Sequence, residues 1–207
     1  MAQKHASPQL KKIVKEFMDR NRGKLYSPIP HPDFEGWPSN HGTERFEIIE
    51  PHLDHPGGTV LDIGTHFGNF AQWMENHGYA VTAIEHSKKY AFAAREIRDL
   101  LGGRFEVIES SFADVQPLKY DIALALNIFH HSLKSKETFD RLVDFLHALD
   151  VETMFFQAHV PEERQMQGSY RNMSQEEFVA FVSEHARLPN VQHLGIENKR
   201  NIFKLTR

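Results

Sequence analysis

The sequence predicts an α/β domain in which a mostly parallel sheet carries helices on both faces. From Thr59 onward, apolar strand-like runs alternate with amphipathic helical patterns, and this alternation is typical of a parallel sheet. The last two strand-like runs, 191–196 and 201–206, are separated by only four residues. A gap this short permits a hairpin but no crossover helix, so the final strand is expected to run antiparallel to its neighbour.

Each expected element follows from a local pattern. Ser7 and Pro8 are a cap and first-turn pair for an amphipathic helix that reaches about Asn21. The segment 26–42 is rich in Pro, Gly and aromatic residues and is expected to be a long loop, after which Thr43 is expected to cap a short helix. Further strands are expected at 59–63, 80–85, 104–108, 120–126 and 152–159, and further helices at 68–77, 88–101, 134–149 and 174–186.

The length and composition favour a single domain with an N-terminal extension. The chain has 207 residues, of which 40% are hydrophobic, enough for one sizeable core. We therefore expect residues 1–42 to form an N-terminal helix and lid loop, and 43–207 to form the main domain.

The absence of cysteine excludes disulfide scaffolds, thiolate metal sites and cysteine nucleophiles. The first residues lack the apolar run of a secretory signal, and no long apolar stretch follows, so we expect a cytoplasmic protein without membrane insertion. The oligomeric state stays open, with a homodimer as one option.

Charge is unevenly distributed along the chain. Residues 1–24 hold seven basic and two acidic side chains, a net charge of +5, which leaves −9 for the remainder. An acidic body argues against a broad nucleic-acid surface, because phosphate neutralisation supplies most of the affinity of such surfaces. The basic arm keeps nucleic acid as an alternative partner, although such an arm is more often the solvated face of a helix.

The strongest motif is a glycine-bearing turn that follows an apolar strand. Gly64 and Gly68 lie between the strand at 59–63 and a helical pattern, where glycines allow a tight bend and a close approach to a ligand. About twenty residues later the second strand ends in Glu85, a position from which a carboxylate accepts hydrogen bonds from ribose hydroxyls. Asp62 lies within the apolar strand, where an unpaired charge is costly. It either caps a local turn, or organises the loop and meets an ammonium group of the ligand.

These residues resemble a known family. The run Val60-Leu-Asp-Ile-Gly-Thr-His-Phe-Gly-Asn-Phe70 is similar to the first motif of the Rossmann-like class I S-adenosylmethionine-dependent methyltransferases, and Ala83-Ile-Glu85 resembles the second. The resemblance extends from about residue 43 to the C-terminus. It implies a seven-stranded sheet in the order 3-2-1-4-5-7-6 with strand 7 antiparallel. It also implies that Asp62 and Gly64 lie around the methionine part of S-adenosylmethionine, or of the product S-adenosylhomocysteine, with Gly68 at the helix start. Glu85 would hold both ribose hydroxyls.

The sequence departs from the family pattern at two points. His66 stands where the family usually has the middle glycine, so its side chain either contacts the methionine part or acceptor, or is a tolerated bulky turn residue. Ser111 occupies the position where the family commonly has an acid facing adenine, with Phe112 beside the ring. A hydroxyl accepts a hydrogen bond more weakly than a carboxylate does. Asp114 is an alternative partner, and Phe112 is equally compatible with the core.

The acceptor is expected at the carboxyl ends of the strands. The residues after the fourth strand begin with Asn127, which is expected to face the transferable methyl group, and include His130 and His131. Either histidine is a candidate base, because imidazole accepts protons near neutral pH, and either could instead fix the loop. Gln157 and His159 end the neighbouring strand and could touch the acceptor. No acid-rich spacing accompanies the histidines, so no metal ion is expected.

Three hypotheses follow from these residues. The leading one is an enzyme that methylates an O or N atom of a small-molecule, saccharide or polysaccharide-linked acceptor, because Arg45-Phe-Glu-Ile-Ile49, the His130-His131 pair and Arg200-Asn-Ile-Phe203 look similar to methyltransferases of bacterial surface-polysaccharide and natural-product pathways. The second is an RNA or tRNA methyltransferase that uses the basic arm. The third is a cofactor-binding protein without turnover. The segments 26–42 and 161–173 are expected to form a lid, with aromatic residues that either contact the acceptor or tether the loop.

Overall fold

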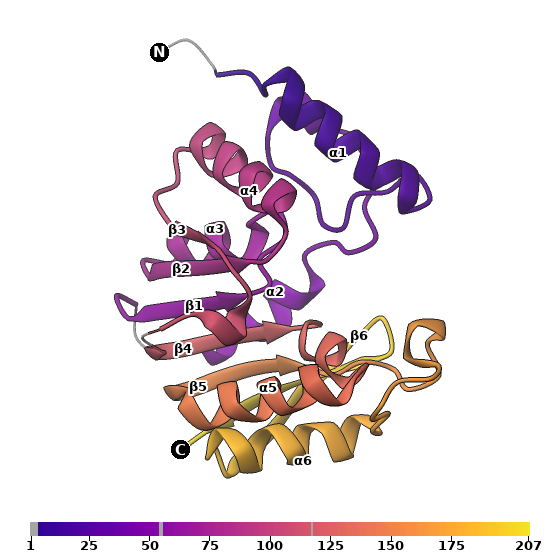
Figure 1. The fold of residues 1–207 in the computed structure, drawn as a ribbon. Coiled ribbons are helices and arrows are strands. Elements are labelled where there is room, and N and C mark those ends of the chain that lie inside the picture. Colours follow the sequence, from indigo (N-terminus) through magenta and orange to yellow (C-terminus); the bar gives the residue numbers. More distant parts are fainter. Residues whose placement is uncertain (1–3, 54–55, 117) are drawn as a thin grey trace.

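The computed structural model describes residues 4–53, 56–116 and 118–207. These residues form a seven-stranded sheet in the order β3-β2-β1-β4-β5-β7-β6 (Figure 1). All neighbouring strands are parallel except β7, which runs antiparallel to both β5 and β6. The predicted α/β class, strand order and antiparallel last strand are confirmed. The strands are β1 (Thr59–Ile63), β2 (Ala80–Glu85), β3 (Glu106–Glu109), β4 (Lys119–Leu126), β5 (Asp150–Gln157), β6 (Asn190–Glu197) and β7 (Arg200–Thr206).

Helices cover both faces of this sheet. On one face, α5 and α6 bury their apolar stripes against β1, β4, β5 and β7, and each begins with a capping box, which satisfies backbone N–H groups of the first turn. On the other face, α2, α3 and α4 pack around a second apolar cluster. The helices are α1 (Pro8–Arg20), α2 (Glu44–Ile49), α3 (Asn69–Asn76), α4 (Lys88–Leu101), α5 (Lys136–Ala148) and α6 (Gln175–Ala186).

The N-terminal segment packs on the outside of α4 (Figure 1). Ser7 caps α1, as predicted, by accepting a hydrogen bond from the backbone of Leu10. A third apolar cluster then joins α1 and the following loop to α4. Within it Phe34 is almost fully buried and Trp37 packs edge-on against it, with ring centroids 5.3 Å apart. These two aromatic residues therefore tether the loop.

Several local predictions differ from the structure, and one is the fifth strand, which spans Asp150–Gln157 instead of 152–159. Thr43 precedes α2, but its hydroxyl donates to the carboxylate of Glu47 (2.6 Å) and does not accept a backbone N–H. An N-cap residue normally has extended backbone angles. Thr43 has helical ones, so its hydroxyl is not placed to accept from the first turn of α2. The third strand begins at Glu106 instead of Arg104, because the backbone N–H of Arg104 is held by the carboxylate of Glu75.

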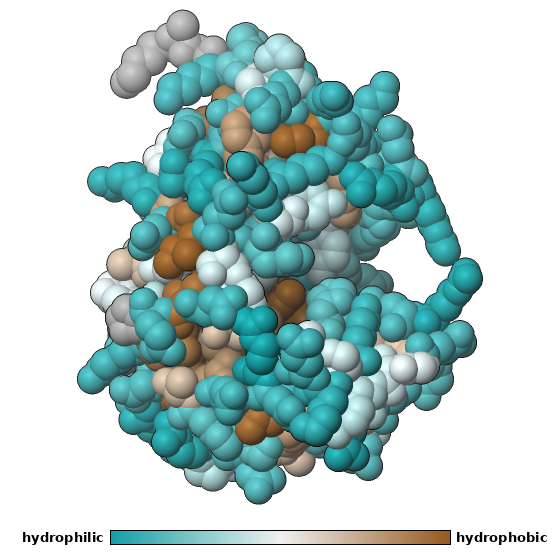
Figure 2. Space-filling view, in the orientation of Figure 1, coloured by the Kyte–Doolittle hydropathy of each residue, from teal (hydrophilic) through white to brown (hydrophobic). Residues whose placement is uncertain are grey.

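The surface is hollowed at the level of the carboxyl ends of the strands, between the N-terminal part and the part that carries α5 and α6 (Figure 2). Polar and charged side chains surround this hollow in the view shown. Among the described residues, no helix is long and apolar enough to cross a membrane.

Candidate active site

The turn between β1 and α3 approaches its neighbours so closely that only glycine fits at its start. Gly64 has a φ of +76°, and the backbone N–H groups of Gly64 and Thr65 both donate to the carbonyl of Ile84, at 2.9 and 3.0 Å. A Cβ added to Gly64 would lie 2.6 Å from Cδ1 of Ile128. The turn is therefore fixed against the ends of β2 and β4, and its backbone stays exposed to a ligand.

Glu85, at the end of β2, is held by backbone donors. Its Oε2 accepts from the backbone N–H of His66 (3.0 Å), and its Oε1 accepts from that of Ser87 (2.8 Å). Burial raises the pKa of Glu85, and these backbone donors oppose the increase. Each carboxylate oxygen has a second lone pair, and His86, an exposed residue, lies 3.3 Å from Oε1. This geometry fits two hydroxyl donors of a ribose.

Asp62 is a buried carboxyl with an unsatisfied oxygen. Burial raises its pKa to about 6, the nearby carboxylate of Glu85 acts in the same direction, and the hydroxyl of Thr65 opposes both. Its Oδ2 has no hydrogen-bond partner among the described residues. An unpartnered buried carboxylate is costly, so Asp62 fits a ligand that supplies a cationic donor such as an ammonium group.

His66 stands where the resembled motif usually has a glycine, and its ring packs among four aromatic rings. Its ring lies 4.0 to 5.5 Å from the rings of Phe17, Tyr26, Phe67 and Tyr90, measured between centroids. Burial lowers the pKa of His66 to about 3, so the ring is neutral at physiological pH. The positive φ of +56° is tolerated because this packing holds the residue in place.

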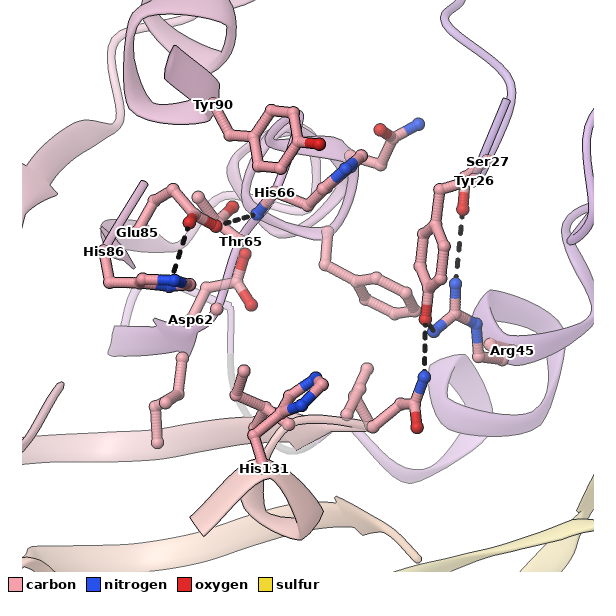
Figure 3. Close-up of a pocket in the computed structure, with 17 residues that line it drawn as sticks. Tyr26, Ser27, Arg45, Asp62, Thr65, His66, Glu85, His86, Tyr90 and His131 are labelled. Atoms are coloured by element: carbon pink, nitrogen blue, oxygen red, sulfur yellow. Dashed lines mark hydrogen bonds and ion pairs between the residues drawn. The ribbon is translucent and has the colours of Figure 1, made fainter. Parts of the chain in front are cut away.

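These residues surround a cavity of about 240 Å³ (Figure 3). Glu85 and Tyr90 lie on one side of it, Tyr26 and Arg45 on the opposite side, and His131 below. Six predicted residues line this cavity: Asp62, Gly64, His66, Glu85, Asn127 and His131.

The other predicted site residues are not among the described residues that line this cavity. Gly68 begins α3, and a Cβ there would lie 2.8 Å from Cζ of Phe105, so packing explains this glycine. Phe112 contacts Phe129 and Phe145 in the core, with centroids 5.6 and 4.8 Å apart. Ser111 precedes the short helical turn Phe112–Asp114 and makes no side-chain cap bond. The roles predicted for these residues toward the cofactor stay predictions.

The two adjacent histidines have different positions. His131 lines the cavity, and burial lowers its pKa to about 4, with Lys134 adding to the effect. His130 is 2% exposed, and burial lowers its pKa to about 2. Both rings are therefore neutral near pH 7, and His131 is the one that borders the cavity.

The N-terminal wall of the cavity was missed by the sequence reasoning. Arg45 donates to the Ser27 hydroxyl (3.2 Å) and the Tyr26 hydroxyl (3.4 Å), and its guanidinium lies over the Tyr26 ring. Asn127 donates to the same Tyr26 hydroxyl at 3.0 Å. One signal was available in the sequence: Arg45 lies one turn before the buried Ile49, on the apolar face of α2, where a charge requires partners.

Metal ligation has no support in the described residues, which contain no group of three or more His, Cys, Asp or Glu side chains arranged to hold an ion. The cavity instead presents single polar groups on an apolar lining, which is the usual composition of a site for a small organic ligand.

Residues 61–149 match a family model described as a methyltransferase domain. This range contains the glycine turn, Glu85 and the loop after β4, all within a sheet of the methyltransferase strand order. Residues 61–149 therefore have the sequence pattern of a methyltransferase domain, set in a sheet of the class I methyltransferase strand order. The unpaired oxygen of Asp62 and the backbone-held carboxylate of Glu85 fit the ammonium and ribose groups of S-adenosylmethionine, the cofactor that the sequence resemblance implies.

Solved structures share the fold of this chain. The bifunctional kinase-methyltransferase WbdD superposes with a TM-score of 0.73 at 18% identity, over 95% of this chain and 45% of that one. The 1,6-didemethyltoxoflavin-N1-methyltransferase of Burkholderia thailandensis, solved with S-adenosylhomocysteine, gives 0.58 at 18% identity, over 78% and 75%. A SAM-dependent methyltransferase of Aquifex aeolicus gives 0.56 at 22% identity, over 77% and 86%. The chain thus spans less than half of the WbdD chain, and no curated protein matches its sequence.

Proposed function

We propose that the chain transfers a methyl group from S-adenosylmethionine to an O or N atom of a small-molecule, saccharide or polysaccharide-linked acceptor. The observation that carries this proposal is the shared cavity: Glu85 and Asp62 line it together with Tyr26, Asn127 and His131. The first two suit the cofactor, and the last three lie where the strand topology puts an acceptor. S-adenosylmethionine supplies an electrophilic methyl group on sulfur, so the protein's own task is to orient an acceptor and manage its proton.

Four residues are proposed to hold the cofactor. Glu85 accepts from the ribose hydroxyls, and the exposed backbone at Gly64 lets the methionine part approach. Asp62 and Arg45 carry opposite charges in the same cavity, which matches the ammonium and carboxylate of an amino acid. Arg45 also has a buried Nε without a partner among the described residues, so one donor remains for a carboxylate.

The acceptor is proposed to be polar and rich in hydrogen-bond donors. Oδ1 of Asn127 and Oε1 of Gln157 are buried acceptor atoms without a partner in the described part of the chain. Gln157 ends the strand next to Asn127, whose backbone N–H donates to its carbonyl at 3.4 Å. Unpaired buried acceptors favour ligands that bring hydroxyl or amino groups, and saccharides bring several.

The segments 26–42 and 161–173 are proposed to act as the lid, in keeping with a domain division at residue 42. The first segment contributes Tyr26 and Ser27 to the cavity. The second is joined to β7 by an ion pair in which Arg200 donates to Glu163 at 2.6 and 3.0 Å. Tyr170 is exposed, and the Arg171 guanidinium lies 5.2 Å from its ring centroid, which leaves a surface for a sugar or aromatic ring.

The test uses the full chain and S-adenosylmethionine with a tritiated methyl group. Separated low-molecular-weight, saccharide and RNA fractions of a bacterial lysate serve as acceptors, and Glu85→Ala is the control variant. Label in the first two fractions, dependent on Glu85, is the expected result. Label in RNA alone would establish the alternative that uses the basic arm. Binding of S-adenosylhomocysteine in calorimetry without label in any fraction would favour the cofactor-binding protein without turnover.

A further inference from the structure

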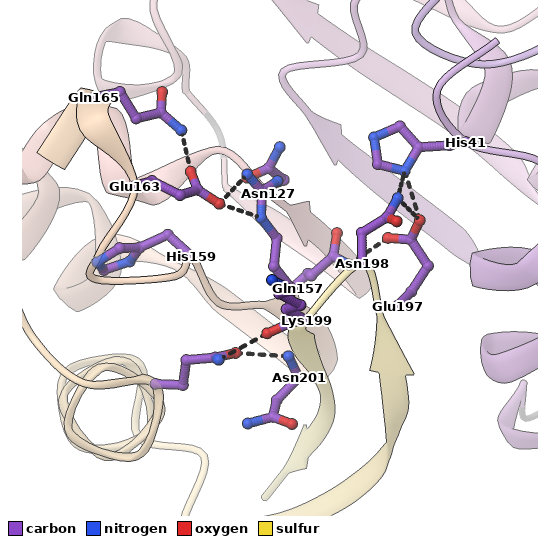
Figure 4. Close-up of polar contacts among 12 residues, drawn as sticks. His41, Asn127, Gln157, His159, Glu163, Gln165, Glu197, Asn198, Lys199 and Asn201 are labelled. Atoms are coloured by element: carbon purple, nitrogen blue, oxygen red, sulfur yellow. Dashed lines mark hydrogen bonds and ion pairs between the residues drawn. The ribbon is translucent and has the colours of Figure 1, made fainter.

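A second polar cluster, centred on His41 and Glu197, lies next to the cofactor cavity (Figure 4). Neither of these two residues is among the described residues that line the cavity. At its centre, Nδ1 of His41 lies 2.6 Å from Oε1 of Glu197. The two residues are 156 positions apart, and their side chains are 8% and 5% exposed. His41 ends the N-terminal loop and Glu197 ends β6, so the contact forms only when this loop lies against the β6–β7 turn.

The hydrogen bonds around Glu197 determine which ring nitrogen of His41 faces it as a donor. Its Oε2 accepts from the amide of Gln157 (3.1 Å) and its Oε1 from the amide of Asn198 (2.5 Å). Burial alone would raise the pKa of Glu197, but the hydrogen bonds from His41 and Gln157 lower it overall. An ionised carboxylate only accepts hydrogen bonds, so Nδ1 of His41 donates to Glu197. The Asn198 amide, 3.1 Å from the same Nδ1, gives its hydrogen bond to Glu197 as well. In the neutral form of the ring, the lone pair is then on Nε2.

Nε2 of His41 faces away from the ion pair. Figure 4 shows the second ring nitrogen of His41 pointing away from Glu197. In the described part of the chain Nε2 has no hydrogen-bond partner, and it is not one of the fully buried unpaired atoms. A neutral imidazole with Nδ1–H held by a carboxylate and Nε2 open is the arrangement that accepts a proton and stabilises the resulting imidazolium.

Two contacts link this pair to the methyl-transfer end of the cavity. The His41 ring packs against the Tyr26 ring, with centroids 4.6 Å apart, and Tyr26 lines the cofactor cavity. Gln157, which donates to Glu197, also accepts from the backbone of Asn127. Tyr26 and Asn127 are themselves joined by a hydrogen bond. The pair therefore borders the same residues that face the acceptor.

The other histidines near the cavity lack this arrangement. His130 has both ring nitrogens buried and unpaired among the described residues. His131 lines the cavity but makes no ion pair with a carboxylate in the described ranges. His86 does contact a carboxylate, but at 3.3 Å this is Glu85, at the end proposed for the ribose.

We infer that His41, positioned by Glu197, takes the proton from the acceptor; the inference rests on the proposed methyl transfer. The acceptor X–H bond breaks and the proton passes to Nε2 of His41. The electron pair left on X forms the bond to the methyl carbon, and the pair of the former carbon–sulfur bond stays on sulfur. Glu197 balances the imidazolium charge and acts as a positioning residue. Because His41 belongs to the lid loop, the proton acceptor is complete only with the loop closed.

The first test reads the His41 tautomer by nitrogen-15 magnetic resonance of histidine-labelled full chain saturated with S-adenosylhomocysteine. We expect the proton on Nδ1 in the wild type and in Glu50→Gln, which alters a surface pair with His77 at 2.8 Å. Loss of this preference is expected in Glu197→Ala. A proton on Nε2 in the wild type would overturn the inference. This readout needs no acceptor.

The second test measures methyl transfer to the lysate fraction that the wild type labels. We expect His41→Gln and Glu197→Gln to lower the rate at least a hundredfold, with S-adenosylhomocysteine affinity within twofold of wild type and His77→Gln unchanged. Full rates in both active-site variants would overturn the inference. A wild type that binds S-adenosylhomocysteine but labels no fraction would instead contradict the proposed function, and the tautomer would still decide the assignment of His41.

Discussion

The backbone N–H of His66 donates to Oε2 of Glu85 across 3.0 Å. This bond fastens the glycine turn after β1 to the end of β2, so the two cofactor motifs form one rigid unit. The bond aligns the carboxylate from the backbone and leaves a second lone pair on Oε2 for a ligand, whereas Oε1 is also contacted by His86 at 3.3 Å.

Glu85→Gln is expected to weaken S-adenosylhomocysteine binding more than tenfold in calorimetry. The amide keeps the shape but loses the charge that strengthens hydrogen bonds from the ribose, a difference of about 1.5–3 kcal/mol. Glu109→Gln is the matched control, because Glu109 is the register partner of Glu85 on β3. Equal affinities for the two variants would reject the ribose assignment.

Gly64→Ala and Gly102→Ala separate steric clash from backbone strain. Both glycines have positive φ, +76° and +72°, but a Cβ at Gly102 meets nothing within 4 Å whereas one at Gly64 meets Ile128 at 2.6 Å. Gly102→Ala should cost about 1–2 kcal/mol of unfolding free energy from strain alone and leave cofactor affinity unchanged. Gly64→Ala should cost more and abolish binding. The pair is measured by urea unfolding and calorimetry, and similar behaviour of both variants would contradict the account.

Asp62→Asn is expected to stabilise the cofactor-free protein above pH 6. The folded pKa of Asp62 is about 6 against an ordinary 3.8, so the folded state holds its proton where the unfolded state has lost it. The contribution of Asp62 to stability is therefore fully present below pH 3.8 and is lost as pH rises through 6, a loss of up to about 3 kcal/mol at 1.36 kcal/mol per pKa unit. Asparagine removes this loss.

The measurement for Asp62→Asn is urea unfolding between pH 3.5 and 8, with S-adenosylhomocysteine affinity in parallel. The stability gain should vanish toward the acidic end, while affinity should fall at pH 7 because the ammonium loses its charged partner. A variant that is less stable than wild type at pH 8 would show that Asp62 is satisfied within the protein.

Arg45→Lys is expected to weaken S-adenosylhomocysteine binding about tenfold. Lysine keeps the charge but cannot reach Ser27, Tyr26 and a ligand carboxylate at once, because it lacks the planar fork of donors. Arg141→Lys, in an exposed ion pair with Asp114, should change affinity less than twofold. Calorimetry on both variants decides, and full affinity in Arg45→Lys would remove Arg45 from the cofactor site.

The sequence predicted those parts of the fold and site whose causes are local. The bounds of β1, β2 and α4 match the predicted ranges, because apolar runs there end at glycines or caps. The start of β3 was shifted by a contact from Glu75, which lies 29 residues away in the sequence, and no local pattern contains that information.

The same distinction applies to the site. The glycine turn and Glu85 carry their role in the strand pattern, whereas Tyr26, Arg45 and His41 reach the site only through the packing of the N-terminal segment. That packing depends on the third apolar cluster around α1 and α4. Periodicity predicted the buried face of α1 but not which part of the following loop would meet the strand ends.

The central claim is that the cavity between Glu85 and Tyr26 holds S-adenosylmethionine. The most direct measurement is a crystal structure of the full chain with S-adenosylhomocysteine. We predict the ribose hydroxyls within hydrogen-bond distance of the Glu85 carboxylate and the methionine part beside Gly64 and Asp62. A ligand bound elsewhere, or a cavity filled by side chains at saturating ligand, would contradict the claim.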